Sequence, residues 1–468
     1  MALLQMVGNS EGLLGQKIGV GQTIESATLS QASRDAPLDR VKPNDVIALG
    51  PAWAGSSVNC VPFRVSGLLT RRGLRYCAYY DPSGNVVVAR VAPSDHAVSR
   101  HILANPRPPF DAHRAISLGL DCEGHLHLAF GAHDSTLLVA RSNGPDFDSG
   151  FPGAVPLDDE AGRRVTYPMF LSPPGTGELI LLFRDGSAAD GELRVKRFDA
   201  TARPWRDDPQ PIITGRGTSL SPAGPYLNTP AYGPDGEIAL FIVWRIKSDT
   251  DPEAVSNTGI DCVVSKNGFR GLTTAVGEPL SLPVSRASPT RIIPVPPDAS
   301  LMNQGTAAVR PDGAAMVLTY WDDGDGVPQY RLGWQDRGAW RVSTTSRFRT
   351  PFRLHGPGTL ALPHSRPEIV VGRGGRVLIV FRSREYGGRL ALLSLEPPDY
   401  GLESARCHIL VDEDLGLYEP VVDRSAWAQD GTLLVYVQRC EQQFDGDRKV
   451  FFSSAQARLM TWREEQFA

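Results

Sequence analysis

The chain has 468 residues, of which 41% are hydrophobic and 21% are charged, and its formal net charge is −4. This composition is typical of a large folded protein and excludes a disordered or collagen-like chain. The charge balance also excludes a global positive field that would gather nucleic acid, so any anionic partner has to be bound by a local site.

The N-terminal segment, residues 1–21, lacks the basic start, the apolar core and the small-residue cleavage site of a secretory signal. No apolar run is long enough to cross a bilayer. We expect a chain without a membrane partner, located in the cytoplasm as the sequence stands, or secreted or periplasmic if a longer precursor has been trimmed. The six cysteines show neither a C-x-x-C pair nor zinc-ligand spacing, which predicts separate, mostly buried thiols.

Seven segments along the chain share one pattern, a Gly-containing turn followed by alternating apolar residues. The turn glycines lie 40 to 77 residues apart, a range that brackets the period of four-stranded propeller blades. Because sustained helical periodicity is absent, the pattern predicts an all-β chain. The turn glycines are Gly84, Gly124, Gly177, Gly236, Gly313, Gly375 and Gly431.

We therefore predict a seven-bladed β-propeller as a single domain over residues 41–468, preceded by a segment of residues 1–40 that joins or braces a blade. Gly-rich turns in a protein of two β-sandwiches are the alternative. The pattern specifies no oligomeric state.

An inner strand is expected before each turn, and the two strands of a hairpin are antiparallel, so the start of one lies beside the end of the other. Because the innermost strands of a propeller line its channel, the paired residues should converge on one mouth of that channel. The predicted neighbours are His113 with His133, Tyr167 with Arg184, Asn228 with Arg245, Asn303 with Trp321, Ser365 and Arg366 with Arg382, and Tyr418 and Glu419 with Arg439.

This predicted rim is rich in Arg, His and Tyr and poor in carboxylates. Arginine binds carboxylate or sulfate with two hydrogen bonds, and His and Tyr can exchange protons. A glycosidase would need two carboxylates beside the scissile bond, and none are obvious. The rim suits β-elimination on a uronic acid, in which an Arg offsets the carboxylate charge while His and Tyr act as base and acid. His125 and His127 alternate with apolar residues inside a strand and are expected to be structural.

Residues 111–133, Thr166-Tyr167-Pro168 and residues 182–186 resemble the BNR-repeat-containing seven-bladed propeller lyases, which include propeller ulvan lyases and rhamnosyl-glucuronate lyases. The resemblance implies eliminative cleavage of an anionic oligo- or polysaccharide between rhamnose and glucuronic acid. It implies that His113, His133, Tyr167 and Arg184 are catalytic, with Arg184 neutralising the carboxylate and with His133 and Tyr167 sharing the roles of base and acid.

Arg245, Asn228, Arg382 and Trp321 are the predicted substrate-binding residues. We expect no cofactor and no catalytic metal, while a structural metal ion stays open. Two alternatives also stay open: a sialidase-like glycoside hydrolase, which would use an Arg cluster as well, and a non-catalytic carbohydrate-binding propeller.

Overall fold

The computed structural model describes residues 39–145, 147–157, 162–200, 205–248, 255–354, 358–442 and 454–467. The chain divides into two units, residues 1–38 and residues 39–468, and all described residues belong to the second unit. The predicted bracing role of residues 1–40 therefore lies outside the described residues, except at Asp39 and Arg40. These two residues form β1 (Asp39–Arg40), which pairs in parallel with the outer strand β31 (Arg406–Val411).

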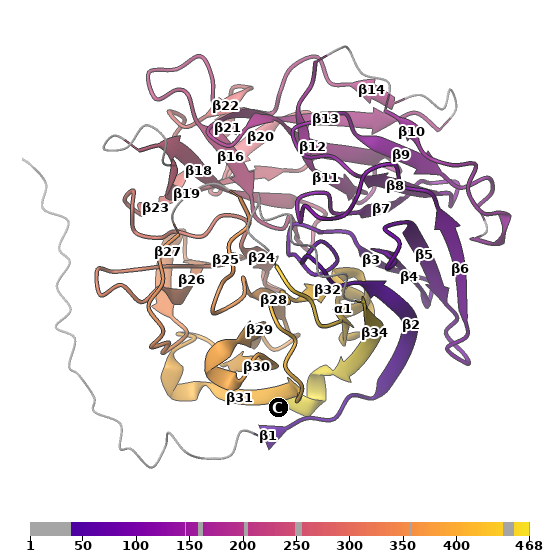
Figure 1. Ribbon diagram of the computed structural model, residues 1–468. Coiled ribbons are helices and arrows are strands. Elements are labelled where there is room, and N and C mark those ends of the chain that lie inside the picture. The colour runs from indigo at the N-terminus through magenta and orange to yellow at the C-terminus, as the bar shows by residue number, and fades with distance from the viewer. Residues whose placement is uncertain are drawn as a thin grey trace, which may run out of the picture. The chain divides into compact units, whose positions relative to one another are not determined.

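The second unit is an all-β propeller, as the sequence predicts, with sheets arranged around a centre (Figure 1). From its inner to its outer strand, the first sheet along the chain consists of β3 (Leu68–Arg71), β4 (Leu74–Tyr80), β5 (Val86–Val91) and β6 (Val98–Leu103). The second, in the same order, is β7 (Ser117–Leu120), β8 (Leu126–Phe130), β9 (Leu138–Arg141) and β10 (Val155–Pro156). The third is β11 (Val165–Leu171), β12 (Leu179–Ser187), β13 (Asp190–Phe198), β15 (Ile213–Thr214) and β22 (Val284–Ser285), with β14 (Trp205–Asp207) also paired to β13.

Three further sheets follow, and one of them combines strands from distant parts of the chain. The fourth sheet is β16 (Gly224–Leu227), β18 (Ile238–Lys247), β19 (Val255–Ser265), β20 (Leu272–Thr274) and β21 (Pro279–Leu280), with β17 (Ala231–Tyr232) paired to β18 and β23 (Arg291–Ile293) to β19. The fifth is β24 (Thr306–Val309), β25 (Ala315–Trp321), β26 (Gln329–Asp336) and β27 (Ala339–Thr344). The sixth is β28 (Glu368–Val371), β29 (Val377–Ser383), β30 (Arg389–Leu395), β31 and β1.

The last sheet joins the two ends of the second unit. It consists of β32 (Val421–Val422), β33 (Thr432–Val437), β34 (Ser454–Arg463) and β2 (Asp45–Trp53). The pairing of β2 with β34 is antiparallel and brings Asp45 opposite Thr461. Inner elements of neighbouring sheets contact one another, β3 with β7, β7 with β11, β17 with β24, β24 with β28, and the helix α1 (Arg424–Asp430) with β3. These contacts run around the centre of the propeller.

The number of blades stays a prediction. The sequence predicts seven blades, but only six of the sheets are recognised as blades of the propeller. The described strands pair in seven sheets. The sheet of β32 is irregular because α1 replaces the tight hairpin turn predicted at Gly431. Asp423 caps this helix by accepting hydrogen bonds from the backbone of Ser425 and Ala426, and Gly431 ends it in a left-handed conformation.

All seven predicted turn glycines have positive φ angles, between 68° and 92°. A side chain is disfavoured in this region of backbone space, which is why glycine marks the turns in the sequence. The other helices of the described residues are short 3-10 turns: Phe147–Ser149, Arg384–Tyr386, Leu402–Ser404 and Glu464–Phe467.

The core lies between adjacent sheets. One cluster, for example, joins Val86 and Val88 of β5 to Leu126 and Leu128 of β8. All six cysteines are free thiols, and four of them are buried, in agreement with the prediction from their spacing. None of the helices among the described residues has the length and apolar character that crossing a bilayer requires.

Candidate active site

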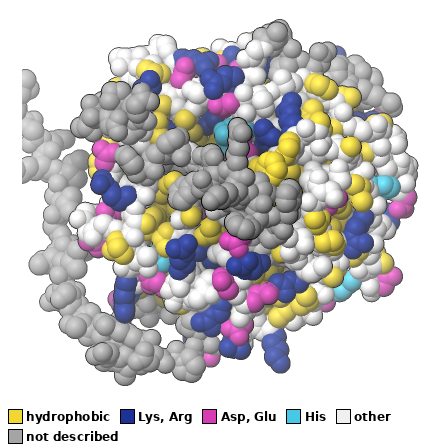
Figure 2. All heavy atoms as spheres, in the orientation of Figure 1, with side chains coloured by type: hydrophobic (Ala, Val, Ile, Leu, Met, Phe, Trp, Pro, Cys, Tyr) yellow, Lys and Arg dark blue, Asp and Glu magenta, His cyan; other side chains and the backbone are white. Residues whose placement is uncertain are grey.

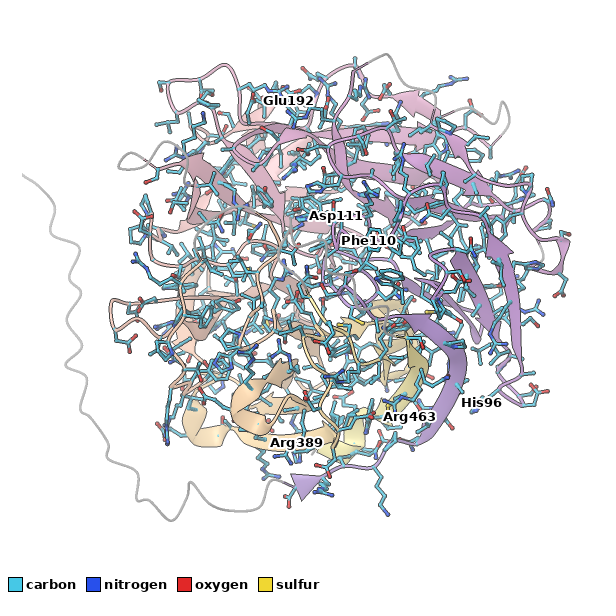
Figure 3. The ribbon with its side chains drawn as sticks, in the orientation of Figure 1. His96, Phe110, Asp111, Glu192, Arg389 and Arg463 are labelled. Carbon is cyan, nitrogen blue, oxygen red and sulfur yellow. The ribbon has the colours of Figure 1, made fainter. Side chains whose placement is uncertain are left out.

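A polar pocket lies where several of the predicted strand ends meet. Its wall includes Phe63, His113, Tyr167, Arg245 and Arg366, and Asn303 and Gln304 line it as well. In Figure 3, Asp111, two residues before His113, lies near the centre of the ring of sheets, whereas Glu192, Arg389 and Arg463 lie at its periphery. On the face drawn in Figure 2, the described basic and acidic side chains are intermingled.

Tyr167 enters this pocket because of an irregularity in the hairpin of β11 and β12. Thr166 pairs with Arg184 and Met169 with Leu182, so β11 contains one residue more than its partner strand between these pairs. Such a bulge bends the strand and re-aims a side chain. Tyr167 also has a φ of 58°, which is uncommon for a residue with a side chain, and residues held in such a conformation cluster at functional sites.

Arg184 lies behind the pocket wall, between two tyrosine rings. Its guanidinium carbon is 4.9 Å from the centroid of Tyr167 and 4.8 Å from that of Tyr226, and the residue is only 2% exposed. Nη2 lies 3.3 Å from Oδ1 of Asp134, while Nε and Nη1 have no hydrogen-bond partner among the described residues. The predicted adjacency of Arg184 and Tyr167 is confirmed, but Arg184 is not part of the pocket lining.

The ring centroids of Tyr167 and Tyr226 are 5.8 Å apart. The surroundings of the two rings shift their pKa values in opposite directions. Burial raises the pKa of Tyr167 above its ordinary value. Burial also opposes ionisation of Tyr226, but the guanidinium groups of Arg184 and Arg245 outweigh it, and the pKa of Tyr226 lies below the ordinary value. A pair whose environments separate their pKa values in this way is typical of acid–base sites.

Arg245 is the cation of the pocket wall that lies beside Tyr226. Nε donates to Oδ1 of Asn257 at 3.0 Å, and Nη1 lies 3.5 Å from the Tyr226 hydroxyl. Asn257 in turn donates to the carbonyl oxygen of Leu301 at 2.7 Å. Two side chains of the fourth sheet therefore hold Arg245 in one orientation at the pocket, and the backbone of the loop before β24 holds Asn257 in turn.

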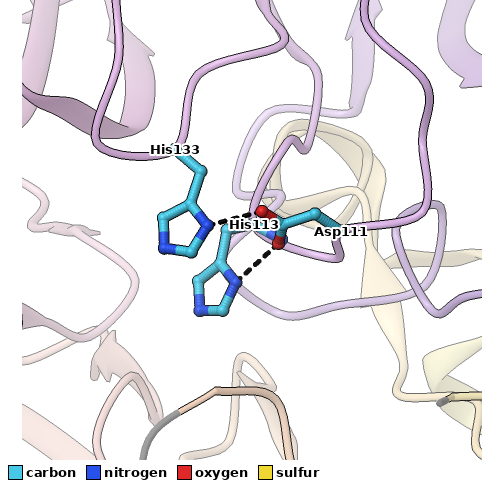
Figure 4. A group of neighbouring side chains, drawn as sticks. All are labelled: Asp111, His113 and His133. Carbon is cyan, nitrogen blue, oxygen red and sulfur yellow. Dashed lines mark hydrogen bonds and ion pairs between the residues drawn. The ribbon is translucent and has the colours of Figure 1, made fainter. Parts of the chain in front are cut away.

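His113 and His133 lie side by side, as the hairpin geometry predicts. Their ring centroids are 4.0 Å apart, and their planes differ by 15°. Nδ1 of His113 is 2.8 Å from Oδ1 of Asp111, and Nδ1 of His133 is 2.5 Å from Oδ2 (Figure 4). His113 lines the pocket and its ring centroid is 5.8 Å from that of Tyr167, whereas His133 is not among the residues that line it.

One group of side chains among the described residues could hold a metal ion, because its ligand atoms lie close together. The group consists of Asp111, His113 and His133. A structural zinc site has four ligands at about 2.0–2.3 Å. These three side chains already bond one another at hydrogen-bond distances, so they fit a hydrogen-bonded cluster and not an ion site. The structural metal left open by the sequence is therefore not assigned to this cluster, and it stays a prediction.

Arg366 is the second arginine of the pocket wall, and Glu419 compensates its charge. Nε and Nη2 of Arg366 donate to the two carboxylate oxygens of Glu419 at 2.9 and 2.5 Å. Phe63 lies over this guanidinium at 5.1 Å and stacks on His113 at 5.6 Å. Phe63 thus joins the Arg366 side of the pocket to the histidine side.

The structure places three predicted substrate-binding residues outside this pocket. Asn228 is fully buried opposite Phe241, four residues along from the Gly224 that faces Arg245. Trp321 packs in the core between the fourth and fifth sheets. The predicted adjacency of Asn228 and Arg245 is wrong because the inner strand begins at Gly224, four residues earlier than predicted, so Gly224 pairs with Arg245.

Arg382 is also outside the pocket, and its hydrogen bonds explain why. The residue is 1% exposed, and Nε, Nη1 and Nη2 donate to the carbonyl oxygens of Tyr418, Pro363 and Leu362. Three of the five N–H groups are engaged by backbone carbonyls and the side chain is buried, so the guanidinium does not face the pocket. The interpretation of Arg382 as a binding residue is therefore corrected to a structural one.

Sequence reasoning missed Tyr226, Phe63 and Asp111. Asp111 had a usable signal, since it stands two residues before His113 and an Asp at that spacing readily bonds the following backbone. Phe63 had none, because it lies in the loop between β2 and β3, outside the repeats.

A family comparison matches residues 74–348, more than half of the chain, to a model described as BNR repeat-containing family member. The chain belongs to this BNR repeat-containing family. No curated protein sequence matches it.

Several solved structures share the propeller fold. A PL25 ulvan lyase aligns with a TM-score of 0.62 at 14% identity, over 82% of this chain and 91% of its own. A structure of a PL25 ulvan lyase bound to -[GlcA(1-4)Rha3S]- aligns with a TM-score of 0.63 at 14% identity, over 82% and 91%. The polysaccharide lyase Uly1 aligns with a TM-score of 0.65 at 13% identity, over 90% and 100%.

Proposed function

We propose that the protein is a polysaccharide lyase that cleaves a uronic-acid-containing glycan by β-elimination. The observation that carries this proposal is the pocket in which His113, Tyr167 and Arg245 meet. It combines a cation for a carboxylate with two groups that exchange protons, and this is the set that elimination beside a uronate requires.

In the proposed reaction, Arg245 binds the carboxylate and so makes the neighbouring C5 proton more acidic. Nε2 of His113 takes this proton, the electron pair forms the C4–C5 double bond, and the bond from C4 to the glycosidic oxygen breaks. Tyr167 donates its phenolic proton to the departing oxygen. Its raised pKa supports this role, because the phenol keeps its proton at neutral pH.

His133 and Arg184 do not line the pocket, and in this proposal they act through the residues that do. His133 packs on His113, and Arg184 places a buried charge beside both tyrosines. The sequence resemblance assigns the carboxylate to Arg184, and we transfer that contact to Arg245 because Arg184 is shielded by the tyrosine rings. We propose that neither a cofactor nor a catalytic metal takes part, so turnover should persist in a chelator.

For the substrate, we propose a linkage between rhamnose and glucuronic acid. The resemblance supports this assignment, as does the glucuronate–rhamnose sulfate oligosaccharide bound to one structural neighbour.

The test is incubation with ulvan, gum arabic side-chain oligosaccharides and other uronic-acid polymers, with Tyr167→Phe as the control variant. Elimination produces an unsaturated uronide that absorbs ultraviolet light, and the wild-type protein should produce it while the variant should not. Saturated sugars at both new ends would instead establish a hydrolase, and binding without cleavage would establish a carbohydrate-binding propeller.

We also propose that the propeller has seven blades, one for each sheet of paired strands. An experimental structure with six blades would contradict this count.

A further inference from the structure

One carboxylate, that of Asp111, joins the two stacked imidazoles of the site. Each of its oxygens faces Nδ1 of a different histidine, Oδ1 that of His113 at 2.8 Å and Oδ2 that of His133 at 2.5 Å. Asp111 and His113 lie before β7, and His133 follows β8, so the carboxylate joins the two ends of one hairpin. Figure 4 shows the second nitrogens of both rings on the same side, away from Asp111.

The charge state of Asp111 decides which ring nitrogens carry hydrogen. Burial alone would raise its pKa, but the hydrogen bonds with His113 and His133 outweigh burial, and the pKa lies well below the ordinary range. An ionised carboxylate only accepts hydrogen bonds, so both Nδ1 atoms must be donors. In the neutral rings, Nε2 then carries the lone pair.

Asp111 fixes the position of His113 as well as its tautomer. Its Oδ1 also accepts the backbone N–H of His113 at 2.9 Å, which ties the main chain to the same carboxylate. Phe63 covers one side of the His113 ring, with planes 18° apart, and His133 stacks at 4.0 Å. His113 is thus held by stacking of its ring and by two hydrogen bonds to Asp111, one from the ring and one from the backbone.

We infer that Asp111 is a positioning residue that sets both histidines to donate from Nδ1 and thereby presents Nε2 of His113 to the substrate as a proton acceptor. The expected effect on turnover rests on the proposed function. The assignment of the tautomers does not depend on it.

The same sheet contains a second Asp–His pair that serves as an internal control. Oδ2 of Asp121 lies 3.0 Å from Nε2 of His127 and also accepts two hydrogen bonds from Arg141. Asp121 and His127 are each 2% exposed and neither lines the candidate pocket. Removing the charge of Asp121 therefore changes an Asp–His contact without touching the site.

The test is Asp111→Asn, compared with wild-type protein by nitrogen NMR of the histidine side chains without substrate. A carboxamide offers one acceptor oxygen and one donor nitrogen, so it cannot accept from both imidazoles. Since Oδ1 also holds the backbone N–H of His113, the donor group should face His133. We expect the proton of His133 to move from Nδ1 to Nε2, while that of His113 stays on Nδ1. Unchanged tautomers in both rings, or protons on Nε2 in the wild type, would overturn the inference.

On a substrate that the wild type cleaves, Asp111→Asn should lower kcat about 10–100-fold and change KM by less than about threefold. The tautomer of His113 is kept in this variant, but a carboxamide no longer offsets the positive charge that the ring gains when it takes the proton, and loss of a supporting carboxylate costs about 10–100-fold at metal-bound histidines. The control variant Asp121→Asn should lower the melting temperature but keep kcat near the wild-type value. Wild-type kcat in Asp111→Asn, or an equal loss in folded Asp121→Asn, would contradict the positioning role. If no uronide is cleaved, the proposed function fails while the NMR comparison still decides the role of Asp111.

Discussion

Strands β12 and β29 have similar sequences, but the arginine near the end of each strand has different partners. Each strand carries an apolar run, a phenylalanine and then an arginine, Arg184 in β12 and Arg382 in β29. Both arginines are nearly fully buried. Arg382 donates to three backbone carbonyls, whereas Arg184 is stacked between Tyr167 and Tyr226 with two nitrogens that no described residue accepts from.

The two regions also hold imidazoles in different ways. Near β29, the His364 ring stacks on Phe348 at 3.7 Å, and its Nδ1 lies 2.8 Å from the Ser383 hydroxyl. Near β12, His113 stacks on His133 beside the pocket. Equivalent positions in a repeat therefore serve folding in one sheet and candidate chemistry in another, and the partners of the arginine distinguish the two roles.

Among the variants that test this difference between the two arginines, Arg184→Ala should have the largest effect. It removes a buried charge from between the two tyrosines, where water does not screen it, and we expect turnover to fall about 10³-fold or more. Arg184→Lys should recover little, because an ammonium does not stack between two rings as a planar guanidinium does. The measurement is kcat of folded protein on a substrate that the wild type cleaves by elimination. Near-wild-type turnover would show that Arg184 is as structural as Arg382.

Arg382→Ala should show the opposite pattern. Three buried carbonyl oxygens lose their donors, which should lower the free energy of unfolding by roughly 4 kcal/mol. Denaturant unfolding measures this loss, and the protein that remains folded should keep its turnover. A large loss of turnover at unchanged stability would place Arg382 in the site after all.

The region of β29 should also carry a pH dependence of stability. Burial lowers the pKa of His364 to about 4, below the ordinary value near 6.5. Between these two pH values the unfolded chain binds the proton and the folded chain does not, so stability should fall as the pH decreases from about 6.5 to about 4. The full effect is about 3 kcal/mol. His364→Phe, measured by unfolding across this pH range, should lack this component, and identical slopes for the two proteins would contradict the assignment.

Tyr226→Phe tests the surroundings of Arg184 and should have a smaller effect on turnover. The hydroxyl lies beside two guanidinium groups, and its loss should lower turnover about 10²-fold. Because the pKa of Tyr226 lies below the ordinary value, the folded protein releases this proton first, and its stability relative to the variant should rise with pH up to about 10. Ultraviolet titration of phenolate formation should show one early-titrating tyrosine in the wild type that the variant lacks. The same titration curve for both proteins would contradict this prediction.

The fold could be predicted because its signals are local. Turn glycines and alternating apolar residues mark each hairpin, and antiparallel pairing then brings His113 to His133 and Tyr167 to Arg184. The prediction failed where a strand begins earlier than its sequence pattern indicates, as at Asn228, and where a helix replaces a turn, as at Gly431. The contacts of Phe63 with His113 and of Arg366 with Glu419 join distant segments, and no period in the sequence encodes them.

The bulge in β11 shows how the place of a key side chain can depend on the number of residues rather than on their identity. Between the pairs that Thr166 and Met169 form with β12, the strand holds one extra residue, and Tyr167 faces the pocket because of it. Deleting Pro168 would restore a regular hairpin with every cross-strand partner available, yet it would change the face on which Tyr167 lies. In a collection of homologous sequences, a single alignment gap at this point would therefore separate chains that keep the fold from chains that keep the tyrosine in the pocket.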